Sequence, residues 1–292
     1  MNEQVTKKRA KSRSQLGLIA LRFKKNKFAV FGLIILCIIA VIILTAPLYI
    51  SYDAAIRQNI SIKFQAPSAE HPFGTDLFGR DMLARIIYGG RISLFTGLAV
   101  ILCSLMMGIV LGGISGYFGG KIDQLIMRII DIFMAIPQIL LVLAIVATLG
   151  TGLVNLIAAL IISMVPRFSR IVRSSILTLK SQEFVEAAQC YGTSTFRIIT
   201  KHLLPNGIGP VIVAATITLG AVIISISSLG FLGVGVEPPT PEWGSLLADN
   251  RSFIRYYPHL GILPGIAIVI TVMCVNFVGD GLRDALDPKM RK

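Results

Sequence analysis

The sequence predicts an all-α, polytopic membrane protein with six transmembrane helices. Hydrophobic residues make up 54% of the chain and charged residues only 15%, whereas a typical soluble domain has about 25% charged residues. The apolar residues also fall in long uncharged runs rather than in the periodic stripes of soluble amphipathic helices. Lipid is therefore expected to cover much of the protein surface.

The first two spans follow from uncharged stretches that are long enough to cross a bilayer. About 20 apolar residues, rising 1.5 Å each, cross about 30 Å of hydrocarbon. Residues 28–46 contain 19 uncharged residues, more than the roughly 7 to 15 of a signal-peptide core, so this run predicts a retained first helix. The uncharged run at 92–120 predicts the second helix.

Four more spans follow from the remaining uncharged runs. Between Asp131 and Arg167 lie 35 uncharged residues, interrupted by Gly150-Thr151-Gly152. This turn predicts a hairpin that contains spans three and four. Spans five and six are expected within 208–228 and 262–277.

The chain accordingly divides into segments that alternate across the membrane. We expect a basic tail at 1–27, a first transmembrane helix at 28–50, an external loop at 51–91, a five-helix core at 92–279 and a C-terminal segment at 280–292. Within the tail, Leu16, Ile19 and Phe23 are spaced to form one face of a short interfacial helix. The alternative is a plain basic flank.

The distribution of Lys and Arg predicts the orientation of the helices. With six spans, one face of the membrane carries 20 of these residues and the other carries seven. Positive residues concentrate on the cytoplasmic side of membrane proteins, so both termini are expected in the cytoplasm. The net charge of +13 lies at the ends of apolar runs, which argues against a nucleic-acid partner.

The cytoplasmic connection at 167–205 is long, charged and rich in helix-forming residues. It predicts a helix from Gln182 to Tyr191, a break at Gly192, and a second helix that Pro205 stops. Glycine suits the left-handed position at a helix end. Beside this break, Glu186 offers a charge to a partner and the following alanines leave a low surface.

Glu186-Ala187-Ala188, then Gly192, then His202-Leu203-Leu204-Pro205 resembles the EAA loop of ABC importer permeases. His202 replaces the usual Ile of that pattern. The resemblance implies the type I permease fold, with cytoplasmic coupling helices seated in two partner ATPase subunits. On this chain the implied coupling residues, within 183–205, are Glu183, Glu186, Ala187, Ala188, Gly192, Leu203 and Pro205.

Stretches outside this loop narrow the resemblance to the dipeptide and oligopeptide importer family, C-type permease. They are His71 to Asp81 with Tyr88 to Arg91, Phe231 to Gly244, and Asp280 to Pro288. The resemblance implies a second homologous permease chain, an extracytoplasmic substrate-binding protein, a peptide substrate and surrounding membrane lipid. It also implies a location in the cell (inner) membrane of a bacterium or archaeon. ATP and Mg would bind the ATPase subunits, with no cofactor or metal on this chain. Related permeases serve glutathione or nickel complexes, which stay open as alternatives.

Several polar residues and one glycine series have structural and functional interpretations. Gly108, Gly112, Gly116 and Gly120 form a strip suited to close helix packing, with gating flexibility as the alternative. Gln138 and Asn155 either line a translocation path or bond to a neighbouring helix. Two ion pairs are expected within single helices, Asp81 with Arg85 and Arg128 with Asp131.

Enzyme motifs are missing from the sequence. The run before Lys121 has Ser115 where a phosphate-binding loop needs its first glycine, and Ile122 follows the lysine. No H-E-x-x-H occurs either, so we expect no catalytic residue and no metal site on this chain. An ATP-independent secondary transporter is a further alternative, but it would need ionisable residues near the membrane midplane.

Overall fold

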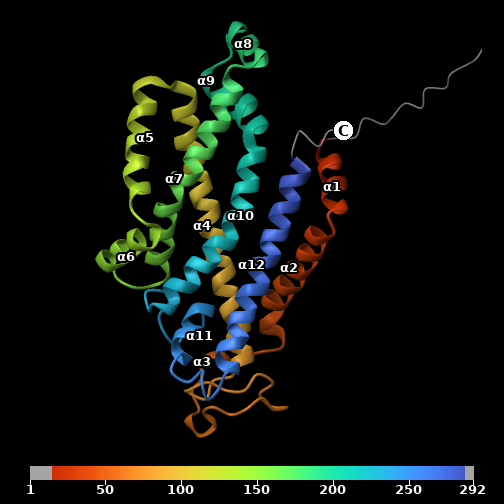
Figure 1. Ribbon diagram of the computed structural model, residues 1–292, viewed down its shortest axis with the longest axis vertical. Helices are drawn as coiled ribbons and strands as arrows, with labels where there is room; N and C mark the ends of the chain where they lie inside the picture. Colours follow the sequence, from red (N-terminus) through yellow and green to blue (C-terminus); the bar gives the residue numbers. More distant parts are fainter. Residues whose placement is uncertain (1–14, 287–292) are drawn as a thin grey trace, which may run out of the picture.

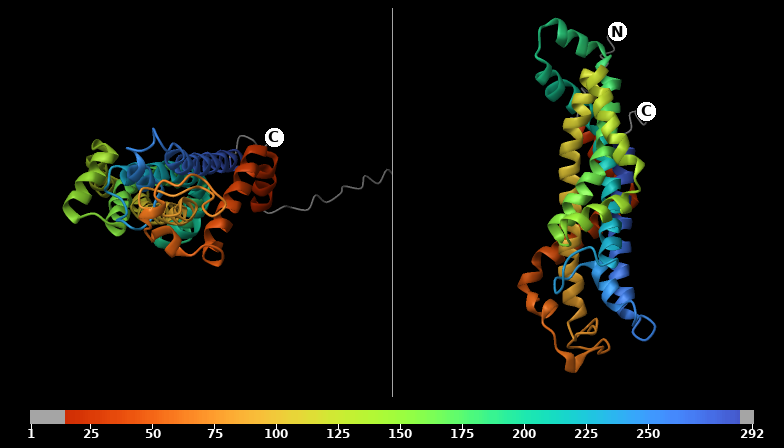
Figure 2. Two further views of the ribbon diagram at one scale, coloured as in Figure 1. Left: turned by 90° about the horizontal axis from the view of Figure 1, so that it is seen from below. Right: turned by 90° about the vertical axis from the view of Figure 1, so that its left-hand side faces the viewer.

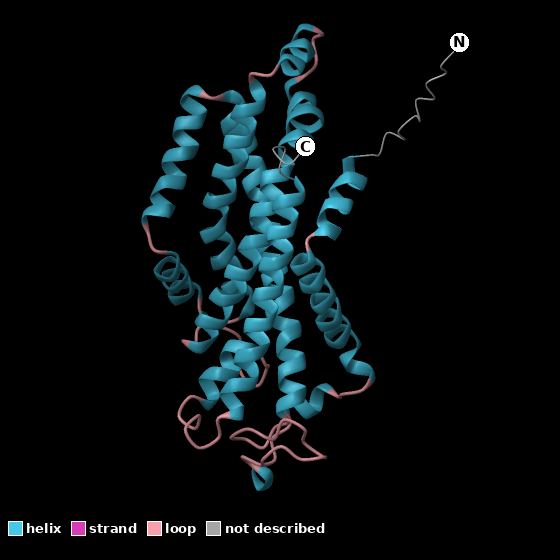
Figure 3. Cartoon of the chain, turned by 45° about the vertical axis from the view of Figure 1, so that its right-hand side comes forward, coloured by secondary structure: helices cyan, strands magenta, loops and turns pink. Residues whose placement is uncertain are grey.

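The computed structural model describes residues 15–286 as an elongated bundle of helices (Figure 1). The long helices are α2 (Lys27–Thr45), α4 (Met82–Phe118), α7 (Leu153–Lys180), α10 (Leu204–Phe231) and α12 (His259–Leu286). Each belongs to a segment that is long and apolar enough to span a membrane. Within the described residues no strand is present (Figure 3), which agrees with the predicted fold class.

The third predicted span is a bent pair of helices. α5 (Gly120–Ala135) and α6 (Gln138–Leu149) meet at an angle of 92°. The break falls at Ile136-Pro137, where proline lacks the N–H for a continuous helix. Counting this pair as one span gives the predicted six. The turn after α6 is as expected, with Gly150 and Gly152 at φ values of 90° and 122°.

Close packing of α4 against α7 depends on glycine. A Cβ added at Gly108, Gly112 or Gly116 would overlap α7, which confirms the packing prediction for these three positions. Gly120 instead begins α5 and has no atom within 4 Å of an added Cβ. The main apolar core forms alongside, where α4, α6, α7 and α10 contribute buried residues such as Phe168.

Ion pairs join α5 to α7 rather than forming within α5. Arg170 of α7 bonds to Asp131, and the Arg173 guanidinium lies 2.5 Å from the Asp123 carboxylate. The expected pair of Arg128 with Asp131 is therefore wrong. The antiparallel helix α7 places the long side chain of Arg170 on the Asp131 carboxylate. The residue spacing within α5 alone does not reveal this partner.

The two ends of the bundle differ, and we name them by their short helices. The α11 end contains η1 (Ala46–Leu48), α3 (Tyr52–Ile56), η2 (Ile60–Ile62) and α11 (Trp243–Asn250) (Figure 1). Here α4 begins at Met82, earlier than the expected helix start at 92. The charges of Arg85 and Arg91 interrupt the apolar run in the sequence, although the helix continues through both residues.

The α8 end contains α8 (Glu183–Cys190), α9 (Thr195–Arg197) and η3 (Ile198–Leu203), which project beyond the other helices (Figures 1 and 2). α1 (Gln15–Lys25) and the end of α12 lie toward the same end. Phe23 of α1 contacts α12 at Gly281, while Leu18 and Leu21 are exposed. The rest of the predicted tail and C-terminal segment, 1–14 and 287–292, lies outside the described residues.

Candidate functional site

At the α8 end, an apolar base supports an exposed polar surface. Val185 and Ala188 of α8 are buried in one cluster with Leu203 of η3 and residues of α7 and α10. Glu183, Glu186, Ala187, Gly192 and Pro205 are exposed. Of the predicted coupling residues, Ala188 and Leu203 therefore hold the loop together, and the other five face outward.

The turn at Gly192 fixes the direction in which the chain leaves α8. Gly192 has φ of +70°, its N–H bonds to the Gln189 carbonyl at 2.9 Å, and Thr193 N–H bonds to the Ala188 carbonyl at 3.1 Å. This pair of bonds is the Schellman helix end, which favours glycine at the left-handed position. The predicted break and its cause are both confirmed.

The second helix of the loop does not stop at Pro205. It runs from α9 through the π-helical η3 directly into α10, so the predicted stop is wrong. Proline is tolerated in the first turn of a helix, where an N–H has no helical partner, and Pro205 occupies that position in α10. The loop is therefore continuous with a membrane helix.

Two aromatic side chains on this surface were missed by sequence reasoning. Tyr191 is 89% exposed and Phe196 is 77% exposed, and they flank the Gly192 turn. Large aromatic residues in a polar connection between spans were the available signal, because they have no core to fill there. Exposed aromatic residues are typical anchors of protein interfaces.

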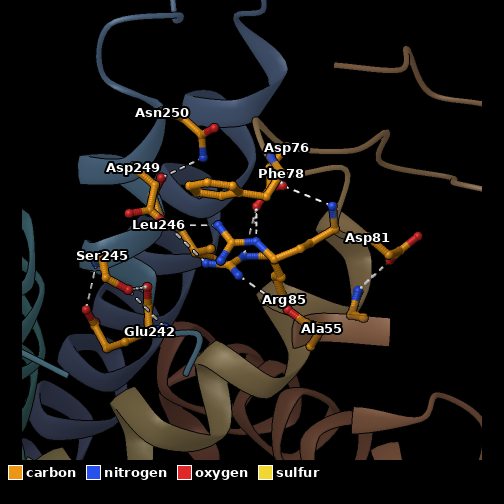
Figure 4. A network of polar contacts seen from close by, with 12 residues as sticks. Ala55, Asp76, Phe78, Asp81, Arg85, Glu242, Ser245, Leu246, Asp249 and Asn250 are labelled. Atoms are coloured by element: carbon orange, nitrogen blue, oxygen red, sulfur yellow. Dashed lines mark hydrogen bonds and ion pairs between the residues drawn. The ribbon is translucent and has the colours of Figure 1, made fainter. Parts of the chain in front are cut away.

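The α11 end contains a buried charge cluster of Asp76, Arg80, Arg85 and Asp249. Figure 4 labels three of its members, Asp76, Arg85 and Asp249. Arg80 Nε lies 2.6 Å from Asp76, and Arg80 and Arg85 lie 3.1 and 3.2 Å from the Asp249 carboxylate. The side chains of Asp76, Arg80 and Arg85 are at most 2% exposed. The cluster is neutral overall and joins three parts of the chain, namely the segment before α4, the first turn of α4, and α11.

The expected pairing of Asp81 with Arg85 is wrong. Asp81 caps α4 by accepting a hydrogen bond from Ala84 N–H at 2.8 Å, and its other oxygen lies 2.8 Å from His71 Nδ1. Arg85 instead points into the charge cluster and donates to the Ala55 carbonyl at 3.3 Å (Figure 4). A capping carboxylate is held at the helix start, so it is not available one turn further on.

Glu242 positions α11 against α4 and α10. It is fully buried, caps α11 through Ser245 N–H at 2.9 Å, and accepts a hydrogen bond from Ser93 of α4 at 2.9 Å. Burial raises the pKa of the Glu242 carboxyl, and the hydrogen bonds that it accepts oppose this rise. The adjacent Trp243 donates from Nε1 to the Ile86 carbonyl at 2.9 Å. α11 is thus docked by directed polar bonds.

The two residues proposed for a translocation path have different surroundings. Asn155 bonds to the carbonyls of Leu149 and Gly150 at 2.9 and 3.1 Å, which ties the turn between α6 and α7. Gln138 lies just after the bend, with a buried amide nitrogen that has no hydrogen-bond partner among residues 15–286. The two do not form one site, and their role in a path stays a prediction.

Within the described part of the chain, no group of three or more His, Cys, Asp or Glu side chains is placed to hold a metal ion. The exposed charged and aromatic side chains of the α8 surface are available for contact with another molecule.

Comparison with known families places this architecture in a class. Residues 108–292 match the family described as binding-protein-dependent transport system inner membrane component, and residues 14–67 match the N-terminal transmembrane domain of oligopeptide transport permease C. The chain belongs to the family of binding-protein-dependent transport system inner membrane components. It is accordingly a multi-pass membrane permease subunit.

Individual relatives agree with this assignment. The chain is 48% identical to the dipeptide transport system permease protein DppC of Alkalihalophilus pseudofirmus, covering 92% of this chain and 88% of the relative. It is 42% identical to OppC of Bacillus subtilis, with 93% and 89% covered. It is 41% identical to the glutathione permease GsiD of Pectobacterium atrosepticum, with 92% and 90% covered.

A solved structure supports the fold. An inward-facing form of the MetNI methionine ABC transporter matches with a TM-score of 0.59 and 22% identity, covering 70% of this chain and 98% of the matched chain. At this identity the similarity concerns the fold alone. It agrees with the predicted type I ABC importer permease architecture.

Proposed function

We propose that this chain is one permease subunit of an ATP-driven importer of dipeptides or oligopeptides. It would pair with a second, homologous permease chain, two ATPase subunits that bind ATP and Mg, and an extracytoplasmic substrate-binding protein. The observation that carries the proposal is the exposed loop at the α8 end, with the EAA-type residues Glu186, Ala187 and Gly192 on its outer face.

In this proposal the α8 end is cytoplasmic and transmits the movement of the ATPase subunits. α8 follows α7 after a two-residue connection, Ser181 and Gln182, and η3 continues into α10. A displacement of the loop therefore reaches two membrane helices without a flexible linker. ATP binding would favour one of two permease conformations through differential affinity, so that the path opens alternately to each side.

The peptide substrate is inferred from relatives rather than from a pocket. The DppC and OppC relatives are named for dipeptide and oligopeptide transport. Glutathione is the second candidate, because the GsiD relatives reach 40 to 41% identity over 92% of this chain. Uptake of a labelled dipeptide, with unlabelled glutathione as competitor, in cells that lack and then regain this chain would separate the two.

Two substitutions in the loop test the coupling: one reverses the charge at Glu186, and the other strains the turn at Gly192. Glu186→Lys and Gly192→Asp should leave membrane insertion intact and lower ATP-dependent uptake about tenfold or more, because a like charge or a strained turn weakens the fit to a partner. Glu70→Lys is the matched control for the first variant, since Glu70 is exposed in the segment before α4 at the opposite end. Insertion and ATP-dependent uptake by the control should stay close to those of the wild type.

Normal uptake by both loop variants would contradict the proposal. Purification of the wild-type complex gives a second, independent check. Two ATPase chains should copurify with this chain and a homologous permease, whereas a secondary transporter would purify and transport without them.

A further inference from the structure

A cavity of about 590 Å³ lies at the α11 end between α4 and the segment that follows α2. Its wall includes Leu48, Tyr49, Ser51, Tyr52, Arg91 and Ile92. Leu48 is 84% exposed and Tyr49 is 53% exposed, so the cavity opens to the outside of the chain. None of these residues belongs to the charge cluster or the α8 loop.

Both walls of the cavity lie at an expected boundary between hydrocarbon and lipid headgroups. The apolar span of α2 and η1 covers 22 residues from Lys27 to Leu48, and at 1.5 Å per residue this is about the thickness of the hydrocarbon. On α4, Arg91 is the last charged residue before the uncharged run from Ile92. Two separate helices therefore change from polar to apolar at this cavity.

Arg91 gives the cavity an unneutralised positive charge. Its side chain is exposed, and it forms no ion pair or hydrogen bond with any of the described residues. The two arginines before it in the chain, Arg80 and Arg85, are both neutralised by aspartates. A guanidinium group with free donors at a headgroup boundary is suited to bind a phosphate.

Ser51 and Tyr52, which line the same cavity as Arg91, add hydroxyl groups to it. Ser51 Oγ accepts a hydrogen bond from Asp53 N–H at 3.2 Å, which leaves its own proton free to donate. The Tyr52 hydroxyl has no hydrogen-bond partner among residues 15–286, whereas Tyr49 and Tyr88 already donate to backbone carbonyls. The cavity thus offers one cation and two hydroxyl donors.

We propose that this cavity binds the phosphate headgroup of an anionic phospholipid from the adjoining leaflet. Arg91 contacts the phosphodiester, Ser51 and Tyr52 donate to its oxygens, and Leu48 and Ile92 contact the start of an acyl chain. About one helical turn deeper, Leu44 is 57% exposed and Phe95 is 50% exposed, so the apolar surface continues in the direction that a chain would take. This continuity favours a lipid over a free phosphate ion.

Lipid binding by the intact complex in a neutral detergent tests the proposal. Native mass spectrometry with added phosphatidylglycerol counts the lipids that stay bound, and diacylglycerol serves as the probe without phosphate. Arg91→Gln should weaken the tightest phosphatidylglycerol site about tenfold or more, because hydrogen bonds to charged groups are lost. Ser51→Ala with Tyr52→Phe should weaken it several-fold. Arg57→Gln, at an exposed arginine outside the cavity, should not change it.

Each of the following outcomes would overturn the proposal. Equal retention by wild type and Arg91→Gln would mean that the cavity is not the site, and equal losses in Arg91→Gln and Arg57→Gln would indicate nonspecific surface attraction. Displacement of the lipid by glycerol 3-phosphate at matched concentration would assign the cavity to a soluble phosphate. Loss of the second permease from the Arg91→Gln complex would assign it to a protein contact.

Discussion

The α8 end and the α11 end are stabilised in opposite ways. At the α8 end, apolar residues such as Val185 and Leu203 are inside, while Glu186 and Tyr191 are outside. At the α11 end, the charges themselves are inside, and Asp76 is fully buried between two arginines. The small apolar base of the α8 end leaves the charged residues of that end free for a partner. The charge cluster of the α11 end instead uses its charges to hold three parts of the chain together.

This difference has an energetic consequence. A neutral cluster of buried ions contributes little net stability, because desolvation offsets the attraction, but removal of one member leaves a buried charge without a partner. Exposed side chains have no such penalty when they are changed. Substitutions in the charge cluster should therefore damage folding, and substitutions at the α8 surface should damage assembly.

The largest expected effect follows removal of a charge from the cluster. Asp76→Asn should destabilise the α11 end by about 3–5 kcal/mol, because it leaves two buried arginines with one carboxylate. Trp243, in α11, is the single tryptophan of this chain, so its fluorescence during thermal unfolding of this chain, purified alone in detergent, reports the change. Asp53→Asn, at an exposed aspartate of α3, should shift the transition little.

A neutral double variant sharpens this test. Asp76→Asn with Arg80→Met removes one charge of each sign and should recover much of the stability lost in Asp76→Asn, because Arg85 and Asp249 remain as a neutral pair. The asparagine amide oxygen can still accept from the backbone N–H groups at positions 78 and 80. If Asp76→Asn lowers the unfolding temperature no more than Asp53→Asn does, the charge cluster is hydrated in the protein. In that case the contrast between the two ends would not hold.

An intermediate effect is expected at the α8 surface, on assembly. Tyr191→Ser combined with Phe196→Ser should weaken retention of the ATPase subunits by about ten- to hundredfold, because a buried aromatic anchor at an interface contributes about 2 kcal/mol or more. Surface plasmon resonance with purified ATPase subunits would measure it. The free energy of unfolding should change by less than about 0.5 kcal/mol.

Tyr256→Ser is the matched control, because Tyr256 is 74% exposed near the α11 end. It should leave ATPase binding unchanged. A loss of thermal stability in the loop variant, with ATPase affinity intact, would mean that these aromatic side chains support the fold and do not contact the partner.

The features predicted from the sequence were those determined by neighbouring residues. The break at Gly192 follows from the left-handed conformation that a helix end requires, and the turn at Gly150 and Gly152 follows in the same way. Uncharged runs likewise gave the long helices. In each case the physical cause acts within about one helical turn or one span length, so a single stretch of sequence contains it.

Features that depend on distant residues were not predicted. Arg85 pairs with Asp249, 164 residues away, and Asp131 pairs with Arg170 of another helix. Arg85 has a nearer carboxylate at Asp81, and Asp131 has a nearer arginine at Arg128, so local spacing indicated the wrong partners. The π-helical junction between α9 and α10 was likewise indicated by no local pattern in the sequence.

The smallest expected effect concerns pH at the α11 end. Burial raises the pKa of Glu242 above its ordinary value, so the folded protein favours the protonated carboxyl. The stability that this contributes is complete below the ordinary pKa and is lost as pH rises through the raised pKa. The unfolding temperature reported by Trp243 should therefore fall with rising pH in that window.

Glu242→Gln should remove this dependence, because the amide is neutral throughout and can still accept from Ser245 N–H. A pH profile that is the same in wild type, Glu242→Gln and the exposed control Glu237→Gln would show that folding leaves the pKa of Glu242 at its ordinary value. The hydrogen bonds that the carboxylate accepts would then offset the effect of burial in full.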